Sequence, residues 1–286
     1  MTTEQAQRSS EPKTLQPQES TTPALAGPAI TTGFRDVDAC LETGLPRGSL
    51  VVIGARPSMG KTSLTLGFAR NIASDQARNV LVFSNESSKS VISHRLLCAE
   101  AEVDSGKALA GTLSEEDLQK VTTAANKLGE LPFWSDCSYP QSVEYIRDKS
   151  LEFAANRSIG LIVVDNIQLL DDLSPTPTRA AAVSHSAVVL KQLAQSVHAP
   201  VLVVAHLPRE VEERVNKRPL LSDLWNAGSL KDNADVVLFL YRHDFYVGDS
   251  PDVGVAEISI EKPSLGKRRV ARLAWIPEQH RFATIG

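Results

Sequence analysis

Five short runs of apolar residues, many of them β-branched, recur along the chain and constrain its fold more than any other feature. They occupy residues 49–53, 79–83, 160–164, 200–205 and 234–241. Almost every position in them is apolar, so both faces of each run would be buried, and helical patterns such as 62–74 and 179–197 separate them. Strands of this kind, joined by helices, form parallel sheets with right-handed crossovers. The sequence therefore predicts an α/β fold with a mostly parallel central sheet and helices on both faces.

The two ends of the chain depart from this pattern. Residues 1–29 are rich in Gln, Ser, Thr, Pro and Glu and hold almost no large apolar side chains, which predicts a disordered polar tail. Residues 30–286 would then form one domain. Near its end, 256–260 and 270–276 flank a turn around Gly266, and this pattern predicts a β-hairpin added at one edge of the sheet.

Composition and charge narrow the classes of function. The formal net charge of -4 gives no general attraction for nucleic acid, so contact with a polyanion would need a local basic strip. Cys40, Cys98 and Cys137 are widely spaced and form no C-x-x-C pair, which indicates reduced thiols. No apolar stretch approaches the roughly 18 residues of a membrane span, and the N-terminus has no signal pattern. These features predict a cytoplasmic protein that makes no membrane contact.

The first apolar run leads directly into a candidate phosphate loop, GARPSMGKTS at 54–63. It matches the pattern G-x-x-x-x-G-K-[ST] except that Ala55 replaces the first glycine. The strand before it and the helix after it favour a true phosphate loop over a chance match in a glycine-containing turn. Lys61 would reach the outer phosphates of ATP, and the Thr62 hydroxyl would hold Mg²⁺. We expect the nucleotide to bind Ser58, Met59, Gly60, Lys61, Thr62 and Ser63.

Three polar residues at other strand ends would complete this site, because the carboxyl ends of parallel strands meet at one edge of a sheet. Asp165 ends a strand and would hold magnesium, although an aspartate there can also cap a helix. Glu86 would orient or deprotonate the attacking water; the alternative is a solvated loop glutamate. His206 would sense the γ-phosphate, or be a strand-end polar residue with no such role. Catalysis would thus depend on Glu86, Lys61 and His206.

Several segments together resemble the motor domain of DnaB-type replicative DNA helicases. The likeness runs over about 31–282 and rests on TGFRDVD at 32–38, GLPRG at 44–48, ARPSMGKT at 55–62, FSNE at 83–86, LIVVDNIQL at 161–169 and KRPLLSDL at 217–224. The resemblance implies a RecA-like fold, a hexameric ring with ATP and Mg²⁺ between subunits, and single-stranded DNA in the central channel.

The chain departs from the family pattern before the motor domain and on the loop that contacts DNA. The family carries an N-terminal helical collar, where this chain shows a short polar tail. After Ser-Asp-Leu the family usually places Arg-Glu-Ser-Gly on the loop that grips DNA, and here the residues are Trp225, Asn226, Ala227 and Gly228. Loss of the arginine removes a phosphate contact, whereas Trp225 would stack on a base if exposed, or pack against the domain. The resemblance nominates Trp225, Asn226 and Gly228 as DNA contacts.

A further departure lies in the final hairpin. There the family has Lys-x-Arg, which reaches the ATP of the neighbouring subunit, and this chain keeps Lys262 but has Ser264 in place of the arginine. Loss of such an arginine finger typically costs about 10³ to 10⁵ in turnover. The cluster at 267–269 would replace it, or form a solvated face of the hairpin. His206 stands where the family has glutamine, and Asn166 where it has tyrosine.

These observations leave two functions open. The first is an ATP-hydrolysing DNA helicase or translocase acting in replication as a homo-oligomer, and Glu86 favours it. The second is an ATP-binding partner or regulator of a replication machine with weakened catalysis, which the lost arginine and the absent collar favour. A clock-type or recombinase-type ATPase would share the core but not the segment at 217–224.

Overall fold

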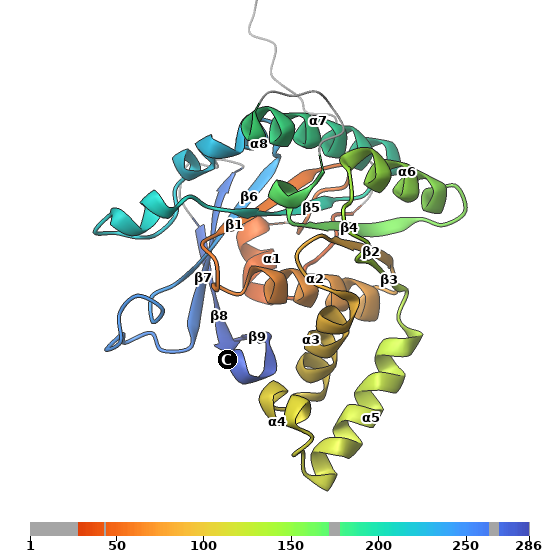
Figure 1. Ribbon diagram of the computed structural model, residues 1–286, viewed down its shortest axis with the longest axis vertical. Coiled ribbons are helices and arrows are strands. Elements are labelled where there is room, and N and C mark those ends of the chain that lie inside the picture. Colours follow the sequence, from red (N-terminus) through yellow and green to blue (C-terminus); the bar gives the residue numbers. More distant parts are fainter. Residues whose placement is uncertain (1–27, 43, 172–177, 263–268, 286) are drawn as a thin grey trace, which may run out of the picture.

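The computed structural model describes residues 28–42, 44–171, 178–262 and 269–285, and for 225–227 the backbone alone. These residues form one nine-stranded sheet in the order β3-β2-β4-β5-β1-β6-β7-β8-β9 (Figure 1). The strands are β1 (Leu50–Ala55), β2 (Asn79–Ser84), β3 (Phe133–Asp136), β4 (Ile159–Asp165), β5 (Val201–His206), β6 (Val236–Arg242), β7 (Val255–Lys262), β8 (Arg269–Ile276) and β9 (Arg281–Thr284). Of the predicted tail at 1–29, all but the last two residues lie outside this description.

The neighbouring strands β3, β2, β4, β5, β1 and β6 pair in parallel. Beyond β6, strands β7, β8 and β9 continue the sheet in antiparallel pairs. The mostly parallel α/β sheet and the added β7–β8 hairpin confirm the prediction from the apolar runs. Sequence reasoning missed the outer strands β3 and β9. β1 lies between β5 and β6, so the loop after β1 opens beside the end of β5.

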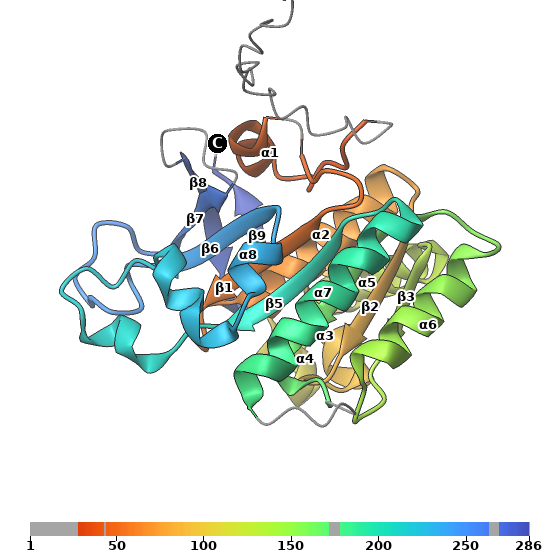
Figure 2. The same cartoon turned by 90° about the horizontal axis from the view of Figure 1, so that it is seen from above.

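Helices cover both faces of the sheet (Figures 1 and 2). One face carries α1 (Arg35–Leu41), α2 (Lys61–Asp75), α3 (Lys89–Ala101), α4 (Ser105–Ala110) and α5 (Glu115–Glu130). The other carries α6 (Val143–Ala154), α7 (Arg179–Val197) and α8 (Leu230–Asn233). Four short 3₁₀ turns are also described: η1 (Ile167–Leu169) after β4, η2 (Arg209–Glu213) after β5, η3 (Leu221–Ala227) before α8, and η4 (Pro277–Gln279) between β8 and β9. No helix in the described parts of the chain is long and apolar enough to cross a membrane.

The central strand β1 shows why its sequence is apolar throughout. Val51 and Ile53 belong to the core beneath α2, whereas Leu50 and Val52 belong to the core beneath α7. Successive side chains of a strand point to opposite faces, so a strand covered on both sides needs apolar residues at every position. All six residues of β1 are buried.

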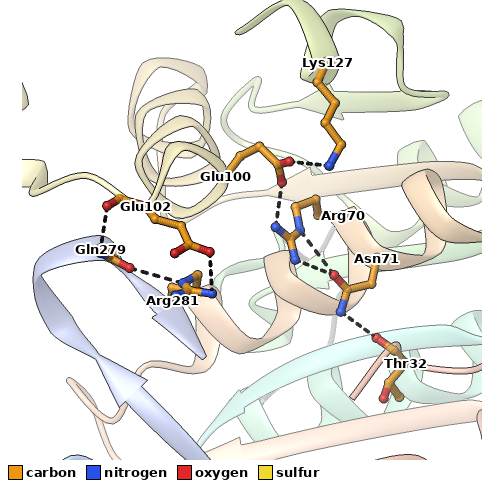
Figure 3. Close-up of polar contacts among 8 residues, drawn as sticks. All are labelled: Thr32, Arg70, Asn71, Glu100, Glu102, Lys127, Gln279 and Arg281. Atoms are coloured by element: carbon orange, nitrogen blue, oxygen red, sulfur yellow. Dashed lines mark hydrogen bonds and ion pairs between the residues drawn. The ribbon is translucent and has the colours of Figure 1, made fainter. Parts of the chain in front are cut away.

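A polar network ties the helices on the α2 face to the chain entering the domain (Figure 3). Glu100 on α3 accepts from Arg70 of α2 at 2.6 Å and from Lys127 of α5 at 2.5 Å. Arg70 also donates to Asn71 at 2.7 Å, and Asn71 donates to the carbonyl of Thr32 at 3.1 Å. One buried amide therefore joins α2 to the segment that precedes α1, while one carboxylate holds three helices together.

A second contact in the same view reaches the C-terminal strands. Arg281 of β9 lies 3.0 Å from the Glu102 carboxylate, and Gln279 donates to the Glu102 carbonyl at 2.8 Å (Figure 3). The end of α3 is thereby fixed against the last part of the sheet.

Candidate ATP-binding site

The phosphate loop is shaped by two residues of positive φ between β1 and α2. Ser58 has φ 64° and Gly60 has φ 100°, and α2 begins at Lys61 with Gly60 as its N-cap. A Cβ on Gly60 would lie 3.0 Å from the ring of Phe282, so both the conformation and the space require glycine. The first turn of α2 receives no side-chain cap from its N-cap residue, Gly60. Its amide groups are therefore available to an anionic ligand.

A cavity of about 360 Å³ lies over this loop, and it brings together most of the predicted nucleotide residues. Its lining includes the predicted Ser58, Gly60, Lys61, Thr62, Ser63, Glu86 and His206. The side chain of Met59 is 1% exposed and belongs to the core, so Met59 would offer only its backbone. The predicted residues from β1, β2 and β5 thus converge on one cleft.

Thr62 and Asp165 form the candidate metal position. The Thr62 hydroxyl donates to Asp165 Oδ2 at 2.7 Å, although β5 separates the strand of Asp165 from β1. Asp165 is 3% exposed, and its Oδ1 has no hydrogen-bond partner among the described residues. Burial raises the pKa of this carboxyl. A buried carboxylate with one unused oxygen beside a hydroxyl is the hard-oxygen set that Mg²⁺ prefers, so these residues fit the ion.

Glu86 is held in place by two neighbours. Its Oε2 accepts from Asn166 Nδ2 at 2.7 Å and lies 3.3 Å from His206 Nε2. The hydrogen bond from His206, together with that from Asn166, lowers the pKa of Glu86 to about 2 in spite of its partial burial. His206 in turn exchanges two backbone hydrogen bonds with the Gln168 amide, at 3.1 and 3.0 Å. Glu86 is therefore an ionised, oriented carboxylate at the rim of the phosphate loop.

Lys61 is buried deep in the cleft. It is 5% exposed, and its Nζ donates to the carbonyl of Arg56 at 2.9 Å. Burial lowers the pKa of Lys61 to about 8, although the charges of Glu86 and Asp165 oppose this shift. A phosphate group would supply the additional negative charge that the ammonium lacks.

Besides Pro57 of the loop itself, the cleft is lined by three residues from distant elements that sequence reasoning missed: Arg95 of α3, Trp275 of β8 and His280 after η4. Among the described residues Arg95 has no carboxylate partner, which suits it to an anionic ligand. His280 bonds the Ser105 hydroxyl at 3.0 Å, and burial, followed by the charge of Arg95, lowers its pKa. No local motif marks these residues, because they reach the site from distant elements.

Lys262 and Arg269, two cations considered for contact with a neighbouring subunit, both have partners within the chain. The Lys262 ammonium donates to the carbonyls of Lys231 and Asp232 at 3.1 and 3.4 Å, at the end of α8 in its own chain. Of the cluster at 267–269, only Arg269 is described, and it pairs with Glu42 at 2.5 Å. Its guanidinium also donates to the Cys40 carbonyl at 3.2 Å. Arg269 is thus engaged within the domain.

The predicted DNA-contacting loop is described only in part. The side chains of Trp225 and Asn226 lie outside the description. Gly228 has φ 58°, and a Cβ there would lie 2.1 Å from Ser184 Oγ and 2.3 Å from the Ala180 carbonyl. Close packing on α7 therefore requires glycine at 228, whether or not its backbone also contacts DNA.

The charged residues of KRPLLSDL are bound within the chain. Arg218 forms two 2.7 Å hydrogen bonds with Glu257, and Arg214 forms an ion pair of 2.7 Å with Asp223. Lys217 donates to the carbonyl of Glu212. These contacts fix the shape of the segment between η2 and η3.

Comparison with known proteins identifies the family. The model of the DnaB-like helicase C terminal domain matches residues 29–284. The chain belongs to this family. It is 35% identical to the replicative DNA helicase DnaB of Geobacillus stearothermophilus and 33% identical to the replicative DNA helicase DnaC of Bacillus subtilis, each over 257 residues. These alignments cover 90% of this chain and 56% of each relative, so the chain spans little more than half their length.

Solved structures agree with this membership. One of them, described as an ATPase domain, superposes with a TM-score of 0.85 at 30% identity, covering 90% of this chain and 92% of that domain. A DnaB-like replicative helicase studied with primase gives the same TM-score and identity, covering 90% of this chain and 62% of the other. The RadB recombinase, at 17% identity and a TM-score of 0.54, shares the fold alone. The expected RecA-like fold and DnaB-type family are therefore confirmed.

Proposed function

We propose that this chain is the ATP-hydrolysing motor of a DnaB-class replicative helicase or translocase. The observation that carries the proposal is the cluster of Thr62, Asp165 and Glu86 at one end of the sheet. It combines a position suited to Mg²⁺ with an ionised carboxylate oriented by Asn166 and His206. Membership of a family whose relatives are named replicative DNA helicases supports the same function.

Each group of residues would have a separate role in ATP hydrolysis. The open amides at the start of α2 and the Lys61 ammonium would bind the phosphates. Thr62 and Asp165 would hold magnesium, which neutralises charge on the outer phosphates when bound. Glu86 would accept a proton from the attacking water, while Asn166 and His206 fix its orientation. His206, at the rim, would also form a hydrogen bond with the γ-phosphate and so sense its presence.

Single-stranded DNA and further copies of the chain are the proposed partners, together with other replication proteins. In this proposal the subunits form a hexamer, Lys262 contacts the ATP of a neighbour, and the segment around Trp225, Asn226 and Gly228 faces the DNA. In the single chain Lys262 is bound to the end of α8. Assembly would have to release the ammonium from those carbonyls before it could reach another subunit.

A second candidate is an ATP-binding regulator of a replication machine with weakened turnover. It is favoured by Ser264, which stands where the family has the finger arginine, and by the engagement of Arg269 with Glu42. An arginine that is paired inside the domain is a poor substitute for a free finger. This chain would then use ATP as a switch.

Steady-state ATP hydrolysis with magnesium, with and without single-stranded DNA, tests the proposal, and Lys61→Ala supplies the background. Turnover that DNA stimulates and that Lys61→Ala abolishes is the expected result. ATP binding without turnover above the Lys61→Ala background would overturn the motor and favour the regulator.

A further inference from the structure

Arg56 contacts the nucleotide cleft and a distant segment at the same time. Its carbonyl accepts from the Lys61 ammonium at 2.9 Å. Its guanidinium points the other way, donating from Nη1 to the Leu207 carbonyl at 2.8 Å and pairing through Nε with Glu212 at 2.9 Å. The Arg56 side chain is 15% exposed, so these contacts are partly shielded from water. The residue whose carbonyl accepts from Lys61 is therefore also the ion-pair partner of Glu212.

The Glu212 end of this contact is tied to the segment that follows β5. Glu212 lies in η2, which Val211 anchors in the core at 1% exposure. Its backbone carbonyl accepts from Lys217, and its carboxylate lies 3.5 Å from the Tyr246 hydroxyl. Leu207 also donates from its amide to the Ala55 carbonyl at 3.1 Å. The exit of β5 is thus joined to the phosphate loop by both backbone and side chains.

Beyond Glu212, two cationic side chains flank a stacked pair of tyrosines. The Lys217 ammonium lies 5.5 Å from the ring centre of Tyr246, which stacks on Tyr241 at 5.8 Å. The Arg218 guanidinium lies 4.7 Å from the Tyr241 ring centre and pairs with Glu257. In Figures 1 and 2 the segment after β5 and the connection between β6 and β7 project together from one end of the sheet. A polyanion bound there would compete for the two cations.

We infer that the Arg56–Glu212 pair transmits the occupancy of the 209–228 segment to the phosphate loop, so that single-stranded DNA and ATP regulate each other's binding. The inference rests on the proposed function. DNA that draws Lys217 or Arg218 out of its internal contacts shifts η2. Glu212 then moves Arg56, and the Arg56 carbonyl changes its hold on Lys61. Glu212 touches neither ligand and is a positioning residue.

The test compares Glu212→Gln with Glu213→Gln, which makes the same charge change at the exposed neighbouring position. ATP affinity is measured with a fluorescent, non-hydrolysable ATP analogue and magnesium, with and without an oligothymidylate. Coupled sites typically change each other's affinity by about 5- to 150-fold. We expect this ratio to hold in the native chain and in Glu213→Gln and to fall towards one in Glu212→Gln. Basal turnover and analogue affinity without DNA are measured for each variant, so that the ratio with and without DNA is compared within one variant.

A double-mutant cycle with Arg56→Lys separates the pair from its surroundings. If the two residues act as one link, Arg56→Lys combined with Glu212→Gln reduces the affinity ratio no further than Glu212→Gln alone. A native affinity ratio in Glu212→Gln would overturn the inference and leave the proposed function standing. Equal losses in Glu212→Gln and Glu213→Gln would overturn it as well, because they would show a general charge effect. If adding DNA changes neither ATP binding nor turnover in the native chain, both the inference and the proposed function are overturned.

Discussion

At the residue scale, Glu86 is the proposed general base, which would separate ATP hydrolysis from ATP binding. Glu86→Gln removes the charge but keeps an oxygen that can accept from Asn166. General-base catalysis contributes about 10² to 10⁴ to a rate, so we expect turnover to fall by that range while ATP affinity changes little. Steady-state hydrolysis and analogue binding measure the two effects, with Glu213→Gln as the control. Undiminished turnover would assign water activation to another group.

The depressed pKa of Lys61 gives a pH dependence with a definite sign. In the proposed site nucleotide phosphates bind the ammonium form of Lys61, and the pKa of Lys61 in the free protein lies at about 8. Above that pH, binding must take up a proton, so affinity falls as pH rises, approaching about tenfold per unit. Titration with the non-hydrolysable analogue between about pH 7.5 and 9.5 measures the slope. The Lys61→Ala variant should bind weakly and without this slope, and a shared slope would point to another titrating group.

At the scale of elements, Glu100 joins α2, α3 and α5 (Figure 3). Burial would raise its pKa, but the Lys127 hydrogen bond and the Arg70 charge lower it, so the carboxylate stabilises the fold above its unfolded pKa and loses this effect as pH falls. Glu100→Gln should lower the free energy of unfolding by about 1–3 kcal/mol at neutral pH. Urea denaturation measures the change. In the exposed control Glu130→Gln, the free energy of unfolding should stay within about 0.5 kcal/mol of the native value. Equal losses in the two variants would show that the Glu100 network does not stabilise the fold.

The elements also show what the sequence could and could not predict. The central strands were predictable because burial on both faces demands unbroken apolar runs, as in β1. β3 was not, since it has only four residues at the sheet edge and Trp134 is 39% exposed. The convergence of the candidate phosphate loop, Glu86 and His206 on one cleft was predictable from local patterns and topology. Arg95 and His280 were not, because tertiary packing alone brings them to the cleft.

At the scale of the whole molecule, the proposed motor requires assembly. A translocase closes a ring around its strand, whereas a regulator can act as a monomer or dimer. We expect light scattering to show six 31.0 kDa subunits per particle in the presence of the magnesium-bound analogue. Lys61→Ala, with weakened nucleotide binding, should assemble less at the same concentration. A native chain that binds the analogue and stays monomeric would favour the regulator.

The position of Lys262 allows the assembly to be tested through its chemistry. If Lys262 contacts the ATP of a neighbour, Lys262→Ala loses one charge-assisted hydrogen bond, of roughly 1.5–3 kcal/mol, and turnover falls about 10- to 150-fold. Lys61→Ala keeps Lys262 but has no working phosphate loop. Mixing Lys262→Ala with Lys61→Ala should then raise turnover above that of either variant alone, because a Lys61→Ala subunit can donate Lys262 to the intact loop of a Lys262→Ala subunit. Mixing that restores nothing, in particles shown to contain both variants by pull-down through an affinity tag on one of them, would confine Lys262 to its contact with α8.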